Sequence, residues 1–257
     1  MTVNKRQTAE RKDFVYAGKT QTSILLEQAC EHNPYICQKS YLHGYDTTKL
    51  IKQTTFAQSL LLLFTGELPS PEEAQLFERL MVALINIGPR HPAVKASMVA
   101  GVSKSNTEHL LPIGLSVLGG KENGAQEVAA AIDFIQNHYE QPIDGLVERL
   151  VNENMRGDEQ GEWHICPGFG NHYGSIDELT QAHANAVFAP FLAGNKASSY
   201  LSWGMSFAQA LEQKGIGLLK TGLAALVCCQ LGIPAREAIG LYQILCAPGI
   251  FAHGVEQ

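Results

Sequence analysis

The sequence Cys166-Pro-Gly-Phe-Gly-Asn-His-Tyr-Gly174 is the most informative stretch of this 257-residue chain. It lies in a glycine-rich segment, residues 157–175, between two segments with helical periodicity. Long irregular connections are uncommon in compact domains and often serve as binding loops or lids. Glycine also lets a backbone approach a ligand closely. The composition leaves two interpretations open, a ligand-binding loop and a mobile surface loop.

The overall composition is that of a globular protein. Hydrophobic residues make up 45% of the chain and charged residues 17%, which excludes a disordered chain. The net charge of -6, without a basic stripe, predicts no nucleic-acid partner. The longest apolar stretch, residues 223–229, is too short to cross a bilayer, and the polar residues 5–12 do not resemble a signal peptide. We therefore predict a cytoplasmic protein with no membrane partner.

The cysteines and histidines do not form a recognisable metal site. Six cysteines occur without a Cys-x-x-Cys pair, as expected for a reduced, cytoplasmic protein. His164, Cys166 and His172 lie close together in sequence, but their spacing matches no closed zinc pattern. We interpret these three as ordinary loop residues and predict no metal.

Helical periodicity runs through almost the whole chain. Ser70, Pro71 and Glu73 are the N-cap, N1 and N3 residues of a capping box, and an apolar stripe follows at helical spacing. Further helices are predicted at residues 47–64, 107–118, 124–138, 143–155, 176–191, 197–213, 215–231 and 234–247, with Pro248-Gly249 ending the last. Residues 21–26 and 35–41 alone have strand character, enough for a small hairpin. The predicted fold class is all-α.

Several stretches, in the same order along the chain, resemble motifs of the citrate synthase superfamily. The opening stretch is similar to the Pro-Gly-Phe-Gly-His loop of citrate synthases. Tyr41-Leu-His-Gly-Tyr-Asp46 resembles the family's Tyr-Arg-Gly-Tyr-Asp-Ile, and Leu60-Leu-Leu-Leu-Phe-Thr-Gly-Glu-Leu-Pro69 resembles its Leu-Leu-x-Gly-Glu-Leu-Pro. Leu118-Gly-Gly-Lys-Glu-Asn-Gly-Ala-Gln-Glu127 resembles Gly-Pro-Leu-His-Gly-Gly-Ala-Asn-Glu. Leu231-Gly-Ile-Pro234 together with Ala252-His-Gly-Val-Glu-Gln257 resembles Leu-Gly-Ile-Pro…Ala-His-x-x-Glu-Gln.

The resemblance implies a citrate synthase-like fold, in which a large helical domain carries a smaller inserted helical domain. The cleft between the two domains would close on a coenzyme A thioester. The large domain would comprise residues 1–122 and 214–257, and the small domain residues 123–213. The chain is closer in length to citryl-CoA lyase modules than to full-length citrate synthases.

The family's catalytic side chains do not recur at the matching positions. In that family an aspartate takes a proton from the thioester methyl group, one histidine supports the enol and another polarises the ketone. Matched to the motifs, the two histidine positions hold Glu122 and Asn171, and the aspartate position holds Leu218. The arginine of the penultimate helix, which binds a carboxylate, corresponds to Cys246. Leucine can neither accept a proton nor carry a charge, so standard citrate synthase chemistry is not expected.

Three side chains near these positions are the catalytic candidates: Glu122, Asn171 and His172. Glu122 could act as an acid or base if it is desolvated in the cleft, or it could be a solvated residue beside Lys121. His172 could take over the lost histidine's role by a register shift, or it could simply be exposed. His91, at a helix start, is interpreted as a structural hydrogen-bonding residue.

The cofactor-binding candidates are backbone groups of the opening stretch. In the family these groups contact the adenine end of coenzyme A, which implies the same role here for Pro167, Gly168, Phe169 and Gly170. Such contacts depend on the backbone, so they can persist when catalytic side chains are lost.

Two functions fit the sequence. The first is a divergent carbon–carbon lyase or acyltransferase acting on a coenzyme A thioester less charged than citryl-CoA. The alternative is a catalytically inactive paralogue that binds a coenzyme A ester or pairs with an active family member, so whether the chain is an enzyme stays open. A homodimer is predicted through apolar helices at residues 76–87 and 218–231, and a hetero-oligomer is the alternative.

Overall fold

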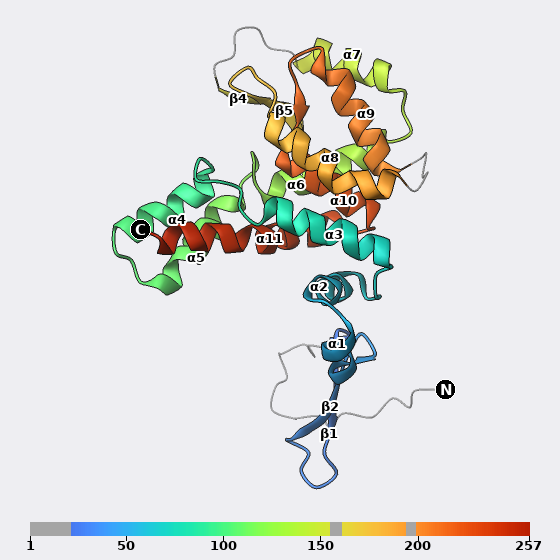
Figure 1. Ribbon diagram of the computed structural model, residues 1–257, viewed down its shortest axis with the longest axis vertical. Helices are drawn as coiled ribbons and strands as arrows, with labels where there is room; N and C mark the ends of the chain where they lie inside the picture. Colours follow the sequence, from blue (N-terminus) through green and yellow to red (C-terminus); the bar gives the residue numbers. More distant parts are fainter. Residues whose placement is uncertain (1–21, 155–160, 194–198) are drawn as a thin grey trace, which may run out of the picture. The chain divides into compact units, whose positions relative to one another are not determined.

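The computed structural model describes residues 22–154, 161–193 and 199–257, and divides the chain into two compact units, residues 1–54 and 55–257 (Figure 1). The polar residues 5–12, residue 21, residues 157–160 of the glycine-rich segment and residues 197–198 lie outside the described residues. The predicted domain boundaries after residues 122 and 213 both fall inside the second unit, and they remain predictions.

The described part of the first unit, residues 22–54, contains a small antiparallel sheet and a short helix. Strands β1 (Leu25–Ala29), β2 (Cys37–Leu42) and β3 (Tyr45–Asp46) lie in the order β1-β2-β3 and are followed by α1 (Thr47–Gln53). His43 and Gly44 connect β2 to β3 with positive φ angles of 46° and 89°, as tight hairpin turns require. Asp46 caps α1 by accepting a hydrogen bond from the Lys49 N–H at 3.1 Å. The predicted N-terminal hairpin is therefore present, with its strands a few residues later than expected.

The helix predicted over residues 47–64 is in fact two helices. Helix α1 ends at Gln53, and α2 (Phe56–Thr65) begins after Thr55. The Thr55 side chain accepts a hydrogen bond from the Gln58 N–H at 3.2 Å, and the Gln58 side chain accepts one from the Thr55 N–H at 2.9 Å. This capping box starts a new helix where periodicity alone suggested continuity.

The second unit is a helical assembly, and the all-α prediction is confirmed. After α2 it contains α3 (Pro71–Leu84), α4 (Pro92–Val102), α5 (Thr107–Leu118), α6 (Ala125–His138), α7 (Ile143–Asn154), α8 (Glu178–Leu192), α9 (Tyr200–Glu212), α10 (Lys220–Gln230) and α11 (Ala235–Val255) (Figure 1). Helices α4, α5 and α11 pack against one another near the C-terminus. The capping box of α3 is formed as predicted, with Ser70 and Glu73 bonded to each other's N–H groups.

Helix α10 is the central helix of this unit. Every residue from Thr221 to Cys229 is buried, and the helix packs against α3, α6, α9 and α11. A helix surrounded on all sides is apolar all round, which explains why Lys220 is its only charged residue. Since α10 has no free face, the prediction that residues 218–231 form a subunit interface is wrong.

Helix α11 is longer than predicted, because Pro248 does not end it. The helix continues to Val255, and its backbone approaches the preceding part of the unit at Gly249, where a Cβ atom would lie 2.4 Å from the Ile85 carbonyl oxygen. By length and composition alone α11 could cross a membrane. It packs against α4, α5 and α6, as the core helix of a globular protein does.

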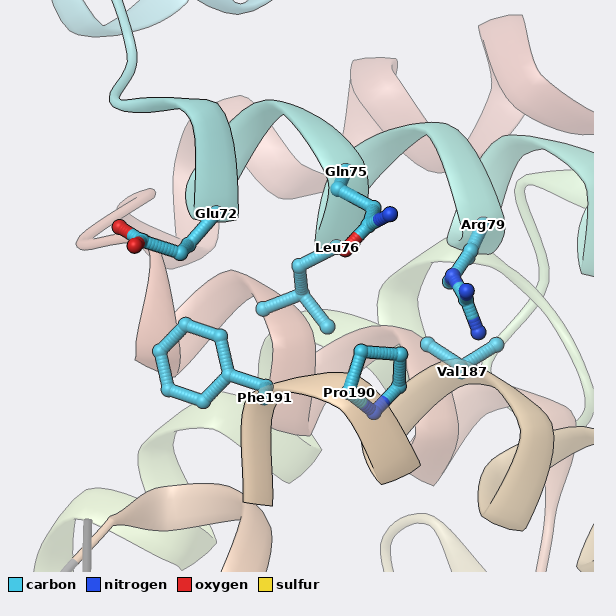
Figure 2. A pocket seen from close by; sticks show the side chains of 7 residues that line it. All are labelled: Glu72, Gln75, Leu76, Arg79, Val187, Pro190 and Phe191. Carbon is cyan, nitrogen blue, oxygen red and sulfur yellow. The ribbon is translucent and has the colours of Figure 1, made fainter. Parts of the chain in front are cut away.

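Pro190 lies inside α8 and removes one hydrogen bond from that helix. A proline has no N–H, so the carbonyl of Ala186, four residues earlier, loses its intrahelical donor. The Arg79 guanidinium of α3 donates to this Ala186 oxygen at 2.7 Å. Figure 2 shows Arg79, Val187 and Pro190 lining a small pocket between α3 and α8. Arg79 thus replaces the missing helix bond and ties the two helices together.

We expect Arg79→Met to lower the free energy of unfolding by about 1 kcal/mol, the net contribution of one such hydrogen bond. In a Pro190→Ala background, the new N–H at residue 190 can bond to Ala186, so the same substitution should cost less. Urea denaturation of the four proteins gives the coupling energy. Equal losses in the two backgrounds would contradict this role of Arg79.

Candidate functional site

The described part of the glycine-rich segment, residues 161–175, contains a β-hairpin where a long irregular loop was expected. Strand β4 (Glu162–Cys166) pairs antiparallel with β5 (Phe169–His172), and β5 pairs with the short β6 (Gly217–Leu218). Pro167 and Gly168 form the turn, where Gly168 has a φ of 82°. A proline followed by a positive-φ glycine is the residue order of a type II turn. The sequence does not predict these strands, because the glycines of this segment are typical of a flexible loop.

Glu127 in the first turn of α6 fixes this hairpin. Its side chain is 3% exposed and is the one buried charged side chain found among the described residues. Oε1 accepts hydrogen bonds from the Gly168 N–H at 3.0 Å and lies 2.6 Å from His164 Nδ1. Oε2 accepts a hydrogen bond from the Asn123 N–H at 2.6 Å. One carboxylate therefore joins the turn before α6, strand β4 and the hairpin turn.

His91 extends this network to the start of α4. Its Nδ1 accepts a hydrogen bond from the Ala93 N–H at 3.1 Å, so Nε2 carries the proton and donates to the Asn123 carbonyl at 2.8 Å. The Asn123 backbone has a positive φ of 54°, and both of its polar groups are held by these contacts. The structural role predicted for His91 is confirmed.

The backbone groups expected to contact coenzyme A are largely used inside the protein. The Gly168 N–H is bonded to Glu127, and the Gly168 carbonyl accepts from the Leu219 N–H at 3.0 Å. Phe169 is fully buried, with its ring 4.8 Å from that of Phe207, and Gly170 pairs with Gly217. For Gly168, the expectation of free backbone groups facing a ligand is therefore corrected. Ligand binding at Pro167, Gly168, Phe169 and Gly170 as a whole stays a prediction.

The predicted catalytic residues lie in three different environments. Glu122 is exposed in the turn between α5 and α6, so the burial that would have tuned it as an acid is not found. Asn171 is 8% exposed, and its buried Oδ1 has no hydrogen-bond partner among the described residues. His172 lies with Nε2 at 3.6 Å from Asp177 Oδ2. No contact among these three side chains is found within the described residues, and their catalytic roles stay predictions.

Asp177 is the N-cap of α8, and its surroundings stabilise its charge. It accepts hydrogen bonds from the Thr180 N–H at 3.1 Å and from the Thr180 hydroxyl at 2.5 Å. The interaction with His172 is the largest cause that holds the pKa of Asp177 well below its usual range, and Thr180 and Lys220 act in the same direction. His172 therefore belongs to the cap of α8.

This pKa shift predicts a pH-dependent contribution to stability. Because the pKa of Asp177 is lower in the folded than in the unfolded state, its stabilisation is complete well above pH 3.9 and is lost as the pH falls below that value. We expect Asp177→Ala to cost about 1–2 kcal/mol at pH 7 and less at pH 3, and Asp177→Asn, which keeps a cap, to cost less at pH 7. Chemical denaturation at both pH values checks this, and an equal loss for Asp177→Ala at pH 3 would contradict it.

The positions matched to the family's aspartate and arginine are buried and uncharged. Leu218 is 0% exposed in β6, and Cys246 is 0% exposed in α11. Burial raises the pKa of the Cys246 thiol to about 12, so it carries no charge at neutral pH. Burial likewise raises the pKa of Tyr242, whose hydroxyl interacts with Cys246. Lys220 supplies a positive charge in this region, and this charge lowers the pKa of Asp177 as well as that of Cys246.

Two residues of the network, Glu127 and His164, were not among the predicted site residues. Glu127 ends a quoted motif, and only the fold reveals that its carboxylate faces the hairpin. His164 has a spacing to Cys166 and His172 that matches no closed zinc pattern, so the sequence alone indicates an ordinary loop residue. Alternation along β4 would have indicated which of its side chains share a face, had the strand been recognised.

The sequence has no significant match to a protein-family model or to a curated protein. Solved structures do resemble the chain. Citryl-CoA lyase from Hydrogenobacter thermophilus is 21% identical with a TM-score of 0.71, over 92% of this chain and 86% of that one. ATP citrate lyase from Methanosaeta concilii, solved with (3S)-citryl-CoA, is 15% identical with a TM-score of 0.67, over 99% of this chain but 43% of that one. Citrate synthase from Thermotoga maritima is 12% identical with a TM-score of 0.53, over 95% and 91% of the two chains. This chain therefore has a citrate synthase-like fold.

Proposed function

We propose that this chain binds a coenzyme A thioester and acts on it as a carbon–carbon lyase or acyltransferase, by chemistry that differs from citrate synthesis. The observation that carries the proposal is the shared fold, which extends over 92% of the chain to a citryl-CoA lyase. An ATP citrate lyase with the same fold was solved with (3S)-citryl-CoA. The hairpin turn fixed by Glu127 is where the family resemblance places the adenine end of the ligand.

The acyl group of this thioester should carry less charge than citryl-CoA. Cys246 occupies the position matched to a carboxylate-binding arginine, and its buried thiol is neutral. Lys220 remains nearby, but Asp177 opposes its charge. A dicarboxylate bound here would lose hydration without gaining enough cationic partners. A neutral or singly charged acyl group fits these residues better.

A first test is thermal denaturation with coenzyme A, acetyl-CoA and other acyl-CoA esters. A ligand at a hundred times its dissociation constant stabilises a protein by roughly 2.7 kcal/mol, which is readily measured. We expect stabilisation by at least one ester, and a larger shift than with free coenzyme A. The absence of any shift up to millimolar concentrations would contradict the proposal.

We also expect no citrate synthase activity. Leu218 is fully buried where the resemblance places the base, so acetyl-CoA and oxaloacetate would find no proton acceptor there. Release of coenzyme A thiol can be followed with a thiol reagent after the reaction is stopped. Release from this pair of substrates at a rate typical of enzymes, about 1–1,000 per second, would overturn the match of positions.

The second candidate function is an inactive paralogue that binds a coenzyme A ester or pairs with an active family member. The burial of Leu218 and Asn171 favours it, because neither offers an acid–base group to a ligand. Binding of an ester without any conversion of it, followed by mass spectrometry over hours, would select this function over the enzyme.

We further propose a homodimer. Apolar side chains that remain exposed on the second unit support it, and they lie on α3 and its C-cap and on α4, α5 and α11: Val82, Ile85, Val99, Val102, Val117, Phe251 and Val255. Soluble monomers rarely expose large contiguous apolar patches, and larger patches mark interaction sites. Light scattering should give a mass well above 28.0 kDa at micromolar concentration. A mass equal to that of one chain would contradict the homodimer. The hetero-oligomer would then be the remaining alternative, and its detection would require the addition of a partner chain.

A further inference from the structure

Strand β1 is an edge strand of the small sheet in the first unit. The order β1-β2-β3 places β2 on one side of β1, and no strand within residues 22–154, 161–193 and 199–257 pairs with its other side. An open strand edge presents unpaired N–H and C=O groups, which makes it a template for pairing with another chain. Proteins usually protect such an edge with proline or lysine, and the sequence of β1, Leu-Leu-Glu-Gln-Ala, contains neither.

The first unit buries little apolar surface of its own. Leu50 is the only buried residue among residues 22–54. Ile24, Leu25 and Leu26, by contrast, are 41%, 42% and 63% exposed. A small sheet needs at least three strands with a covered hydrophobic face to be stable. The uncovered apolar run therefore lies in and directly before the strand whose edge is open.

The hydrogen bonds of β1 to β2 show which of its backbone groups face the open edge. The His43 N–H donates to the Ile24 carbonyl at 2.8 Å, so Ile24 directs its carbonyl toward β2. Hydrogen-bonded and non-hydrogen-bonded pairs alternate along an antiparallel ladder, and the register of β1 on β2 is regular from Leu25 to Gln28. Leu26 therefore also bonds to β2, and the N–H and C=O groups of Leu25 and Glu27 point outward.

Three two-fold registers centred within β1 would let these outward groups bond to the same groups of a second β1. A register centred on Glu27 places two carboxylates directly opposite each other, which is destabilising. A register centred on Leu26 places each Leu25 opposite a Glu27. In the register centred on Leu25, the two Leu25 residues face each other and Ile24 lies opposite Leu26. Glu27 then lies opposite Ser23, whose hydroxyl can donate to the carboxylate.

We propose that β1 pairs antiparallel with β1 of a second copy of this chain, in the register centred on Leu25. Two first units then share one sheet with the strand order β3-β2-β1-β1-β2-β3. The contact is two-fold and self-complementary, so every favourable pair occurs twice. Leu42 and Tyr45 share a face with Leu25 in each unit, and the pairing joins these residues of both copies into one apolar strip.

This inference goes beyond the proposed function, because it does not depend on coenzyme A. The surface also differs from the helical one proposed above for the homodimer, since it belongs to residues 22–54. A second copy is the occupant that the strand itself favours, because the same seven residues, 22–28, match apolar to apolar and acid to hydroxyl when they are paired with themselves.

Disulfide crosslinking of the full chain tests the pairing and its register. The background carries Cys30→Ser and Cys37→Ser, since the other four cysteines are buried. Residues of a hydrogen-bonded pair have Cα atoms about 5.5 Å apart, within the range that a disulfide bridges. Leu25→Cys should therefore form a covalent dimer of twice 28.0 kDa under mild oxidation. Gln38→Cys, at an exposed position of β2, is the matched control for random collision and should react at least tenfold more slowly.

Two further pairs of variants distinguish the registers. Glu27→Cys alone should not crosslink, because its copies lie about 13 Å apart along the strands, and Leu26→Cys is likewise out of register. A mixture of Ser23→Cys chains with Glu27→Cys chains should crosslink at a rate similar to that of Leu25→Cys. Neither of these two chains should do so alone.

A charge placed at the two-fold axis tests the same contact without a cysteine at its centre. Leu25→Lys removes an apolar pair and sets two like charges opposite each other, each change costing up to about 1 kcal/mol. Crosslinking of the Ser23→Cys and Glu27→Cys mixture should therefore fall about tenfold. Gln38→Lys adds the same charge to β2, away from the edge, and should leave the rate within twofold. Circular dichroism checks that each variant is folded.

The outcomes are distinct from those of the ligand experiments. Crosslinking by Leu25→Cys and by the mixed chains, with loss of the latter in Leu25→Lys, supports the inference whether or not a coenzyme A ester binds. Faster crosslinking by Leu26→Cys or Glu27→Cys than by Leu25→Cys would overturn the register proposed. If none of these variants crosslinks faster than Gln38→Cys, a second copy does not cover this edge and the inference fails.

Discussion

Replacing Glu127 by leucine should lower the free energy of unfolding by about 3–5 kcal/mol, the range found when one member of a buried, charged hydrogen-bonded set is removed. The substitution leaves the N–H groups of Asn123 and Gly168 and Nδ1 of His164 without their acceptor. Gly168 is buried, and Asn123 and His164 are only partly exposed, so solvent has restricted access to these donors. Guanidinium denaturation followed by circular dichroism measures the loss.

The adjacent Gln126 provides a matched control for this substitution. Gln126 is exposed on the same turn of α6, so Gln126→Leu should change stability by no more than about 0.5 kcal/mol. Glu127→Gln keeps one acceptor oxygen and should fall between the two leucine variants. A Glu127→Leu protein within 1 kcal/mol of wild type would show that the network contributes little to the fold.

Gly168→Ala should lower the free energy of unfolding by about 2–5 kcal/mol, from two separate causes. Its positive φ of 82° costs an L-residue about 1–2 kcal/mol. Its Cβ atom would also lie 2.6 Å from Gly222 Cα, in the backbone of the central helix α10. Overpacking of this kind costs typically 1–3 kcal/mol more.

Gly174 separates the two causes, because it has a φ of 78° and no atom within 4 Å of the position of an added Cβ. Gly174→Ala should therefore show the conformational cost alone, about 1–2 kcal/mol. Equal losses for the two variants would contradict the contact between the hairpin turn and α10. The comparison also affects ligand studies, since weaker binding by a Gly168 variant would reflect a damaged fold.

Much of the helical architecture could be predicted because its signals are local. The capping box at Ser70 and Glu73 and the apolar stripe after it depend on residues within one helix. The boundaries of α5 were predicted at the observed residues for the same reason. The continuation of α11 through Pro248 could not be predicted, because it is stabilised by packing against α4, α5 and α6.

The candidate site was predicted less well, since its geometry depends on contacts between distant residues. The hairpin stretch and the motif ending at Glu127 were both recognised, but nothing local indicates that the carboxylate of one binds the turn of the other, 41 residues away. The same applies to His164, which gains its partner only when β4 approaches α6. Glu122, chosen by its place in a motif, lies in an exposed turn instead.

Photo-crosslinking with 8-azidoadenine-labelled coenzyme A tests most directly whether the hairpin of this chain receives a coenzyme A thioester. The photoreactive group sits on the adenine ring, so the labelled peptide reports where that end of the ligand binds. We predict one dominant labelled peptide that contains Pro167 and Gly168, with labelling abolished by excess unmodified coenzyme A. Labelling that is spread over other peptides, or that excess coenzyme A does not reduce, would contradict the account.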